Sequence, residues 1–173
     1  MDIIQIGNPV LRNKAQAIKN ATDSEIVQLA NSLIGTAEAA NGVGIAAPQV
    51  AKSCRLFIVA SRPSVRYPHA PTMSPTAVIN PVILRHNDEI VKDWEGCLSV
   101  PNVRGLVPRY QEIEVEYTDI NGNQITKVLT DFVARIFQHE LDHLDGILFI
   151  DRVESMADLY TEEEYQKMIV EAC

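Results

Sequence analysis

The chain contains segments in which apolar residues recur every three or four positions, and this spacing predicts amphipathic helices. The first of them predicts a helix over residues 23–40. Its start carries a capping-box pattern, with Thr22 at the cap and Glu25 three residues later. Asn41-Gly42 follows and should stop the helix. The apolar face consists of Ile26, Leu29, Ala30, Leu33 and Ala37.

Other segments alternate apolar and polar residues, or are short and apolar throughout, and these predict strands. Ile113, Val115 and Tyr117 alternate with glutamates, as in a strand with one buried face. Asn121-Gly122 is a hairpin-turn signal, so the segment after it should pair with this strand. Pro81 suggests that its own segment is an edge strand or contains a bulge. We expect extended segments at 55–60, 77–84, 89–94, 112–117 and 124–129.

A second helix is predicted over residues 131–144, with Asp131 as its N-cap and Gly146 as its C-terminal stop. Apolar residues lie on several of its sides, which indicates a buried helix. One face nevertheless carries His139, Glu140 and His143. Polar groups on a buried helix need partners, and a metal ion would be a suitable one.

The remaining segments complete a single domain over residues 1–173. Residues 1–20 should form an irregular arm, and the prolines within residues 61–76 predict a surface loop. Thr161-Glu162-Glu163-Glu164 is a second capping box, before a short acidic helix that runs to the C-terminus. The expected fold class is α+β, with mostly antiparallel sheets surrounding one buried metal-binding helix, an N-terminal helix and a short C-terminal helix.

Composition narrows the functional classes. The 173 residues include 15 basic and 23 acidic ones, and the net charge of −8 argues against a nucleic-acid surface. No apolar run approaches the roughly 18 residues of a membrane span, and the first residues do not resemble a signal peptide. Three cysteines favour a reducing cytoplasm over a disulfide framework. We therefore expect a cytoplasmic protein that binds neither nucleic acid nor membrane.

The strongest chemical signal is the segment Gln138-His139-Glu140-Leu141-Asp142-His143. On an α-helix, its two histidines lie one turn apart on the same face and can bind one metal ion. The glutamate after the first histidine can handle a proton of a metal-bound water. This is the H-E-x-x-H arrangement of hydrolytic metal sites.

A metal held by two histidines needs at least one more protein ligand. Zincin-type peptidases take it from farther along the chain, where Glu154, Asp158 and residues 162–164 offer carboxylates without a clear spacing signal. Cys97, on an expected bend, is the other candidate. A lone cysteine beside a glycine is usually a small buried apolar residue. The residues by themselves therefore leave the third ligand open.

The glycines of Gly42-Val43-Gly44-Ile45-Ala46-Ala47-Pro48-Gln49 permit unusual backbone conformations and close approach of a ligand. A phosphate-binding loop would need a strand before the glycines and a helix after them. Here a helix precedes them and Pro48 follows, so a nucleotide site is disfavoured. A simple turn into a strand explains the glycines but gives no reason for Gln49.

Three segments, in this order, resemble the signature motifs of the peptide deformylases: residues 42–49, Glu95-Gly96-Cys97-Leu98-Ser99, and residues 138–143. Residues 8–12 and 105–109 are also similar to that family, so the resemblance covers nearly the whole chain. It implies an α+β fold in which sheets enclose the metal helix. It also implies an enzyme, a metal-dependent amidase that removes the formyl group from the N-terminal formylmethionine of new polypeptides. Its partners would be these formyl-methionyl N-termini, whether or not they are met at the ribosome.

By the same resemblance, Cys97, His139 and His143 would be the metal ligands, and the fourth position is left for water. Glu140 would take a proton from this water as it attacks the formyl carbon, and would later deliver the proton to the leaving amine. The resemblance implies one Fe²⁺ per chain in the cell, with Zn²⁺, Ni²⁺ or Co²⁺ also able to occupy the site. The ligand types suit Zn²⁺ and Fe²⁺ alike.

The resemblance further implies that the Gln49 side-chain amide and the Leu98 backbone N–H stabilise the oxyanion, which explains why a glutamine follows the glycines. Methionine needs an apolar slot, and the extended backbone near it could pair with the peptide as an added strand. The expected substrate-binding residues are Val43, Gly44, Glu95, Gly96, Phe132 and Ile136.

Several nearby polar residues have two interpretations. Asp142 either orients a histidine or is an ordinary surface carboxylate. Glu95 and Arg104 either pair at the mouth of the pocket or are separately solvated, and Arg109 is expected in a structural ion pair. Arg135 lies where some family members have an apolar pocket residue. Either its charged head points away and only its stem lies near the pocket, or the pocket is more polar than usual.

Two alternative functions remain at this point. A zincin-like metallopeptidase would take its third ligand downstream of His143 and would not need Cys97. A catalytically silent protein that binds formylated N-termini would not need Glu140 or Gln49, and the presence of both residues speaks against it.

Overall fold

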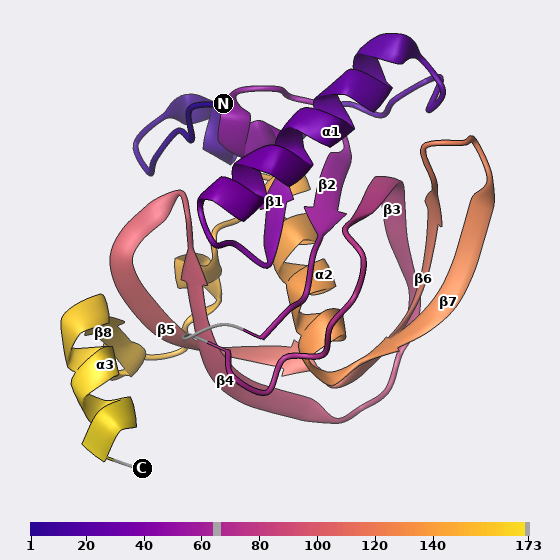
Figure 1. Ribbon diagram of the computed structural model, residues 1–173. Helices are drawn as coiled ribbons and strands as arrows, with labels where there is room; N and C mark the ends of the chain where they lie inside the picture. Colours follow the sequence, from indigo (N-terminus) through magenta and orange to yellow (C-terminus); the bar gives the residue numbers. More distant parts are fainter. Residues whose placement is uncertain (64–66, 172–173) are drawn as a thin grey trace.

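The computed structural model describes residues 1–63 and 67–171 (Figure 1). Within them the chain forms three α-helices: α1 (Ser24–Ala39), α2 (Asp131–Leu144) and α3 (Glu162–Glu171). The strands are β1 (Gly44–Ala46), β2 (Leu56–Val59), β3 (Thr76–His86), β4 (Ile90–Cys97), β5 (Val100–Tyr110), β6 (Glu112–Thr118), β7 (Gln124–Thr130) and β8 (Leu159–Thr161). Short 3-10 helices occupy Pro9–Arg12, Ala47–Val50, Phe149–Arg152 and Met156–Asp158. No described helix is both long and apolar enough to cross a membrane.

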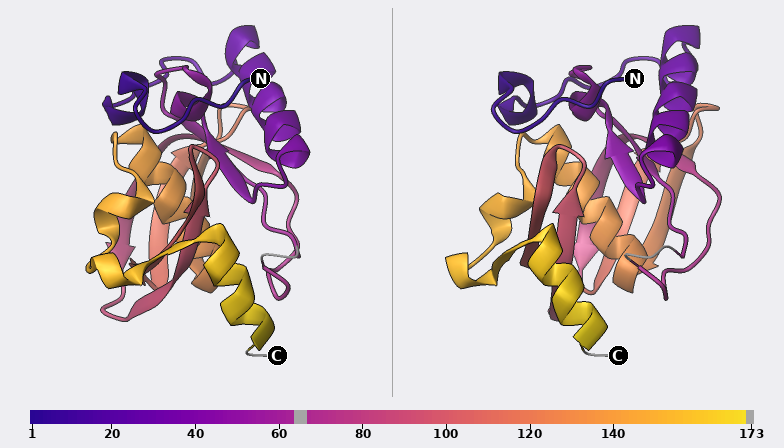
Figure 2. Two further views of the ribbon diagram at one scale, coloured as in Figure 1. Left: turned by 90° about the vertical axis from the view of Figure 1, so that its left-hand side faces the viewer. Right: turned by 60° about the vertical axis from the view of Figure 1, so that its left-hand side comes forward.

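The strands form two antiparallel sheets, with the orders β1-β2-β3-β6-β7 and β4-β5-β8. Helix α2 lies between them and contacts strands of both, while α1 covers β1 and β2 (Figures 1 and 2). Four residues of α2 belong to the main hydrophobic core: Ala134, Ile136, Phe137 and Leu144. The expected α+β class with antiparallel sheets is confirmed, and α2 is buried because its apolar residues have a sheet on more than one side.

Helix α1 forms where it was predicted, but its cap differs from the prediction. The Asp23 side chain accepts a hydrogen bond from the Glu25 N–H, whereas the Thr22 hydroxyl donates to the Asn20 side chain. The predicted N-cap, Thr22, is therefore wrong by one residue, because the N-cap is Asp23. Aspartate is as good a cap as threonine, and its charge also interacts favourably with the helix dipole. The buried face of α1 packs on β1 and β2 through Ala30, Leu33 and Ala37.

Strand β3 contains Pro81 and lies in the middle of its sheet, so the edge-strand alternative is wrong. The bulge alternative is confirmed. The register between β3 and β6 shifts between Ile79 and Val82, and Asn80 has a φ of 50°. A bulge takes the proline out of the regular ladder, so a central strand can tolerate a residue without an N–H.

The predicted hairpin pairs β6 with β7, and Gly122 in its turn has a φ of 85°. Helix α2 follows directly. Its N-cap is Thr130, so the assignment of Asp131 as the cap is wrong; the Asp131 carboxylate instead accepts a hydrogen bond from Gln111. Gly146 has a φ of 75° just beyond the helix, as its predicted role as a stop requires. Half of the second capping box forms, because Thr161 Oγ1 accepts a hydrogen bond from the Glu164 N–H, while the Glu164 carboxylate pairs with Lys167.

The longest strand that the sequence pattern did not predict is β5. It carries Pro101 and Pro108 as well as Arg104 and Gly105. It therefore lacks a clean alternation of apolar and polar residues. Pairing with β4 along most of the length of β5 stabilises this strand despite its unfavourable sequence pattern. The expected loop at 61–76 contains no helix or strand in its described part before β3 begins at Thr76. Residues 64–66 of that loop, and the last two residues of the expected C-terminal helix, lie outside the described residues.

Candidate metal centre

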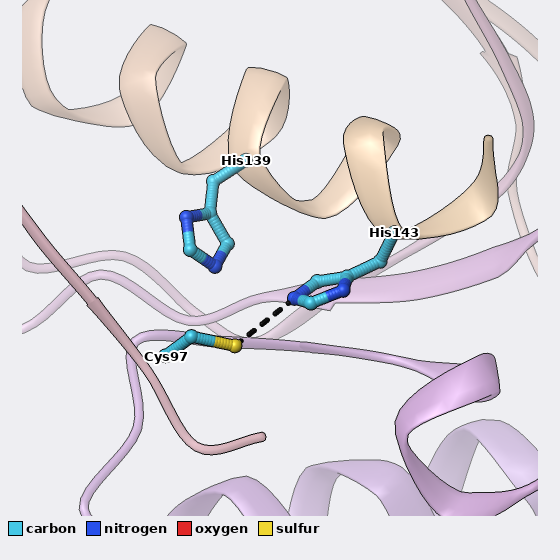
Figure 3. Close-up of side chains that lie close together, drawn as sticks. All are labelled: Cys97, His139 and His143. Atoms are coloured by element: carbon cyan, nitrogen blue, oxygen red, sulfur yellow. Dashed lines mark hydrogen bonds between the residues drawn. The ribbon is translucent and has the colours of Figure 1, made fainter. Parts of the chain in front are cut away.

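Three side chains with metal-binding atoms meet beside α2. His139 and His143 project from one face of the helix, and Cys97 at the end of β4 points to the same place (Figure 3). Their ligand atoms lie within 4.8 Å of one another, and Cys97 Sγ is 3.2 Å from His143 Nε2. Ligands of one tetrahedral ion would lie roughly 3.3–3.8 Å apart. The chain thus brings together the three residues that the sequence singled out, at a spacing that suits one metal ion.

The chemistry of one of these donors, His143, also fits a metal. Burial lowers the pKa of His143 well below its ordinary value, which favours the neutral imidazole that binds metal ions. In the described part of the chain, only two buried side-chain polar atoms have no hydrogen-bond partner, His143 Nδ1 and Glu140 Oε2. Unpaired buried polar atoms are uncommon in proteins and mark a place where a ligand or water acts.

Glu95 holds the first histidine of the pair. Its Oε2 lies 2.8 Å from His139 Nδ1, so this nitrogen donates a hydrogen bond to the carboxylate and Nε2 is the atom left to face a metal ion. Burial acts to raise the pKa of Glu95, but the charges of Arg109 and His139 outweigh it and hold this pKa well below its ordinary value. Glu95 is therefore an anion that orients His139, a role that its position in the motif did not reveal.

The Glu95 carboxylate belongs to a buried ionic network. Arg109 donates to both of its oxygens, at 2.9 and 3.0 Å, and to Asp142 at 2.6 Å. The expected structural ion pair of Arg109 is therefore confirmed. Asp142 is neither a surface carboxylate nor a partner of a histidine, because it is buried and binds Arg109 and Arg152. Both interpretations of Glu95 and Arg104 are also wrong, since Arg104 pairs with Glu162 instead and both side chains are buried rather than solvated.

Arg135 joins the same network. Its guanidinium donates to Glu95 at 2.9 Å and to the backbone carbonyls of Val91 and Val107 at 2.7 and 2.9 Å. The charged head thus points away from the pocket into the β4–β5 sheet, and the stem lines the pocket. This is the first of the two interpretations made from the sequence.

The network predicts a large stability effect at Glu95. Substitution by alanine would leave Arg109 and Arg135 buried without their shared carboxylate, so the free energy of unfolding should fall by about 3–5 kcal/mol. Urea denaturation measures this change. Glu114, whose partner Arg85 is 79% exposed, is the matched control, and Glu114→Ala should have little effect. Equal effects of the two substitutions would contradict the assignment.

Glu140 lies on α2 between the two histidines, and its carboxylate is buried against β1. Burial raises its pKa to about 7, which suits a group that accepts and returns a proton near neutral pH. A Cβ atom on Gly44 would overlap Glu140 Oε1. The second glycine of the first motif is therefore required here so that the strand can pass close to this carboxylate.

Gln49 reaches the same centre from the 3-10 helix Ala47–Val50. Its Oε1 accepts a hydrogen bond from the Ala46 N–H at 2.8 Å, which fixes the amide so that Nε2 points to the opposite side. There Nε2 donates to Ser99 Oγ at 3.1 Å and to Cys97 Sγ at 3.4 Å. The amide is thus a rigid donor at the metal centre. The Leu98 side chain lies nearby in the wall of the pocket.

A pocket adjoins the centre and extends toward solvent. All six residues expected to bind substrate line it: Val43, Gly44, Glu95, Gly96, Phe132 and Ile136. Tyr67 and Trp94 also line it, although sequence reasoning did not place them there, and Arg104 lines it as one interpretation of the sequence placed it. Tyr67 comes from the proline-rich loop and packs on Phe132, a long-range contact that no local pattern encodes.

The downstream carboxylates that a zincin-type site would use have other partners. Glu154 and Asp158 bind Lys92, while Glu163 and Glu164 bind Lys167. Glu162 binds Arg104. Among the described residues, the one group of three or more candidate ligands is Cys97, His139 and His143.

A thiol and two imidazoles at one point, a buried carboxylate beside them and an adjoining apolar pocket are the parts of a metal-dependent hydrolase. The family model described as polypeptide deformylase matches residues 1–158. Peptide deformylase 2 of Nostoc sp. is 66% identical over 169 residues, which are 98% of this chain and 94% of that protein. The chain therefore belongs to the peptide deformylase family, whose members are hydrolases.

Solved structures agree in fold. The class I type b peptide deformylase of Acinetobacter baumannii, in a crystal structure with Met-Ala-Ser bound, gives a TM-score of 0.86 at 42% identity, covering 88% of this chain and 98% of that one. A peptide deformylase from Synechococcus elongatus in complex with actinonin gives a TM-score of 0.80 at 36% identity, covering 91% of this chain and 81% of that one.

Proposed function

We propose that this chain removes the N-formyl group from the N-terminal formylmethionine of newly made polypeptides and releases formate. The observation that carries the proposal is the meeting of Cys97, His139 and His143 beside the buried, unpaired carboxylate of Glu140. A thiolate, two imidazoles and a group that can exchange a proton are what hydrolysis of an amide at a metal requires. The binding of Met-Ala-Ser, a product of this reaction on formyl-Met-Ala-Ser, by the A. baumannii relative supports it.

Cys97, His139 and His143 would hold one divalent cation, with Fe²⁺ expected in the cell and Zn²⁺, Ni²⁺ or Co²⁺ as substitutes. When bound, the cation would supply Lewis acidity and make water a competent nucleophile near neutral pH. Glu95 would keep His139 in the tautomer that presents Nε2 to this cation.

Glu140 would accept a proton from the attacking water and then donate it to the methionine nitrogen as the formyl C–N bond breaks. The pKa of about 7 allows both steps near neutral pH. Negative charge develops on the formyl oxygen during the attack. The Gln49 Nε2–H group and the Leu98 backbone N–H would stabilise that charge, and the Gln49 amide is already fixed by Ala46.

The role of Gln49 predicts a specific kinetic loss. Gln49→Ala should lower kcat by roughly 10²–10³-fold, with a much smaller change in KM, because an oxyanion donor acts in the transition state. Steady-state formate release measures both constants. Ser99→Ala, which removes one contact of the Gln49 amide and leaves its donor in place, is the control. A change confined to KM would contradict the oxyanion role.

The methionine side chain would enter the pocket between Val43, Phe132 and Ile136. Strand β1 lies at the edge of its sheet, so the peptide could pair with the backbone at Val43 and Gly44 as an added strand. Backbone pairing of this kind gives affinity with little dependence on sequence. The net charge of −8 supports a partner other than nucleic acid. We expect the reaction in the cytoplasm, and an encounter with nascent chains at the ribosome stays a prediction.

The experiment that tests the proposal is incubation of anaerobically purified protein with formyl-Met-Ala-Ser, followed by a formate assay and mass spectrometry of the peptide. We expect equal amounts of formate and Met-Ala-Ser. Cleavage between methionine and alanine would instead indicate the metallopeptidase alternative. Binding of the peptide without any product would indicate the catalytically silent alternative.

A further inference from the structure

The β8–α3 segment begins at Leu159, just beyond residues 1–158 that the family model matches. It lies beside β5 (Figures 1 and 2), and one of its carboxylates pairs with Arg104, which lines the pocket. Glu162, the first residue of α3, accepts hydrogen bonds from Arg104 Nε at 2.6 Å and from Nη2 at 3.3 Å. The Arg104 side chain is 2% exposed and the Glu162 side chain 27% exposed. The C-terminal segment therefore supplies the negative charge that partners a buried cation.

Arg104 is held from the pocket side as well. Its Nη1 donates to the Tyr67 hydroxyl at 3.0 Å, and the Tyr67 ring packs on Phe132 with 4.8 Å between ring centroids. The guanidinium also lies against Gly96, where an added Cβ would come within 2.7 Å of Arg104 Cζ. These contacts fix the guanidinium in the wall of the pocket, next to the segment that ends in Cys97.

We call the part of the pocket wall that contains Tyr67, Trp94 and Arg104 the outer wall. In an extended substrate, one particular residue should lie beside it. Successive side chains of an extended peptide point to opposite sides, so the first and third residues point the same way. When methionine enters between Phe132 and Ile136, the side chain of the third residue points to the same side of the peptide, and we place it beside the other residues that line this pocket, among them Tyr67, Trp94 and Arg104. This step rests on the proposed function, because that function places methionine in the pocket.

We propose that Glu162 is a specificity-determining residue that sets the charge preference of the pocket for the third residue of the substrate. Its carboxylate neutralises Arg104, so the outer wall does not attract acidic side chains. Without this carboxylate, the positive charge of Arg104 faces the third residue and acts on it through a medium of lower polarity than water. An element outside the region matched by the family model would thus control which nascent chains are processed fastest.

The test uses three amidated substrates, formyl-Met-Ala-Asp, formyl-Met-Ala-Lys and formyl-Met-Ala-Ser. The measured quantity is the ratio of kcat/KM for the aspartate peptide to that for the lysine peptide. In Glu162→Gln this ratio should rise by roughly two- to fivefold, the scale of one partly exposed charge pair. The rise should largely persist at high salt, because Arg104 is buried and buried charges are screened much less than exposed ones.

Two variants serve as controls. Glu163→Gln removes the same charge from the same turn of α3, but Glu163 is 79% exposed and pairs with Lys167, so the ratio should stay at the wild-type value. Glu162→Asp keeps the charge and should keep the wild-type ratio. A thermal melt of Glu162→Gln checks that the fold is intact.

The outcomes distinguish a failure of this inference from a failure of the proposed function. Formate release from the serine peptide with an unchanged ratio in Glu162→Gln would overturn this inference alone. An equal rise in Glu163→Gln would also overturn it, because the effect would then come from net charge. No formate from any of the three peptides with the wild-type protein would overturn the proposed function, and this inference with it.

Discussion

Replacing Glu140 with glutamine should lower kcat for formate release by roughly 10²–10⁴-fold, while the protein keeps its metal. Glutamine has nearly the same shape as glutamate but cannot accept a proton from the attacking water. Glu140 is buried next to both histidines, and Gly44 leaves room for its carboxylate. Steady-state formate release, measured beside the metal content of the same preparation, checks this expectation.

The melting temperature of Glu140→Gln is the control for a structural role of Glu140. Its Oε2 is buried and has no hydrogen-bond partner among the described residues, so this carboxylate adds little to the stability of the fold. Glu140→Gln should therefore leave Tm unchanged or slightly raise it, as is common when a functional polar group is removed. A variant that lost its metal or melted much earlier would indicate a structural role. Undiminished formate release would exclude the acid–base role.

The second large effect is expected at Cys97. Cys97→Ala removes one of three candidate ligands, so metal affinity should fall by more than the roughly 10–100-fold that loss of an outer partner of a ligand costs. Formate release should fall with it at limiting metal. Equilibrium dialysis followed by elemental analysis measures the affinity directly.

Cys54 is the matched control for this substitution. It is a partly buried free cysteine that packs against a different hydrophobic cluster from Cys97, and burial raises the pKa of its thiol. Cys54→Ala should therefore keep the wild-type metal content and activity. If Cys97→Ala also retained its metal, then the two histidines would need a third ligand other than Cys97.

The sequence predicted the parts of the fold that local patterns encode. The 3.6-residue period of α2 and the alternation in β6, followed by Asn121-Gly122, each lie within one continuous segment. Strand β5 was not predicted because its proline and glycine residues break the local strand pattern. Its stability comes instead from pairing with β4, which the local sequence does not indicate. The caps of α1 and α2 were each displaced by one residue; for α1 the reason is that neighbouring polar residues are nearly equivalent caps, whereas Thr130 caps α2 without a side-chain hydrogen bond.

The residues of the candidate site likewise divide into those that local spacing predicts and those that it does not. The two histidines and Glu140 were recognisable because helical spacing alone puts them on one face. Cys97 and Gln49 are distant in sequence, so only the family resemblance connected them to the histidines. The partner of Glu95 was misjudged because two arginines, Arg104 and Arg109, both lie on the next strand, β5. Strand register decides between them: Arg109 lies toward α2, and Arg104 lies toward Glu162 of α3.

One titration tests most directly the claim that Cys97, His139 and His143 bind a single catalytic metal. Metal-free protein is titrated with Co²⁺ under anaerobic conditions, and the near-ultraviolet thiolate-to-cobalt absorbance and formate release are recorded from the same samples. We expect both signals to rise together and to saturate at one ion per chain, with both absent in Cys97→Ala. Formate release by metal-free protein, or saturation of the absorbance without any formate release, would contradict the claim.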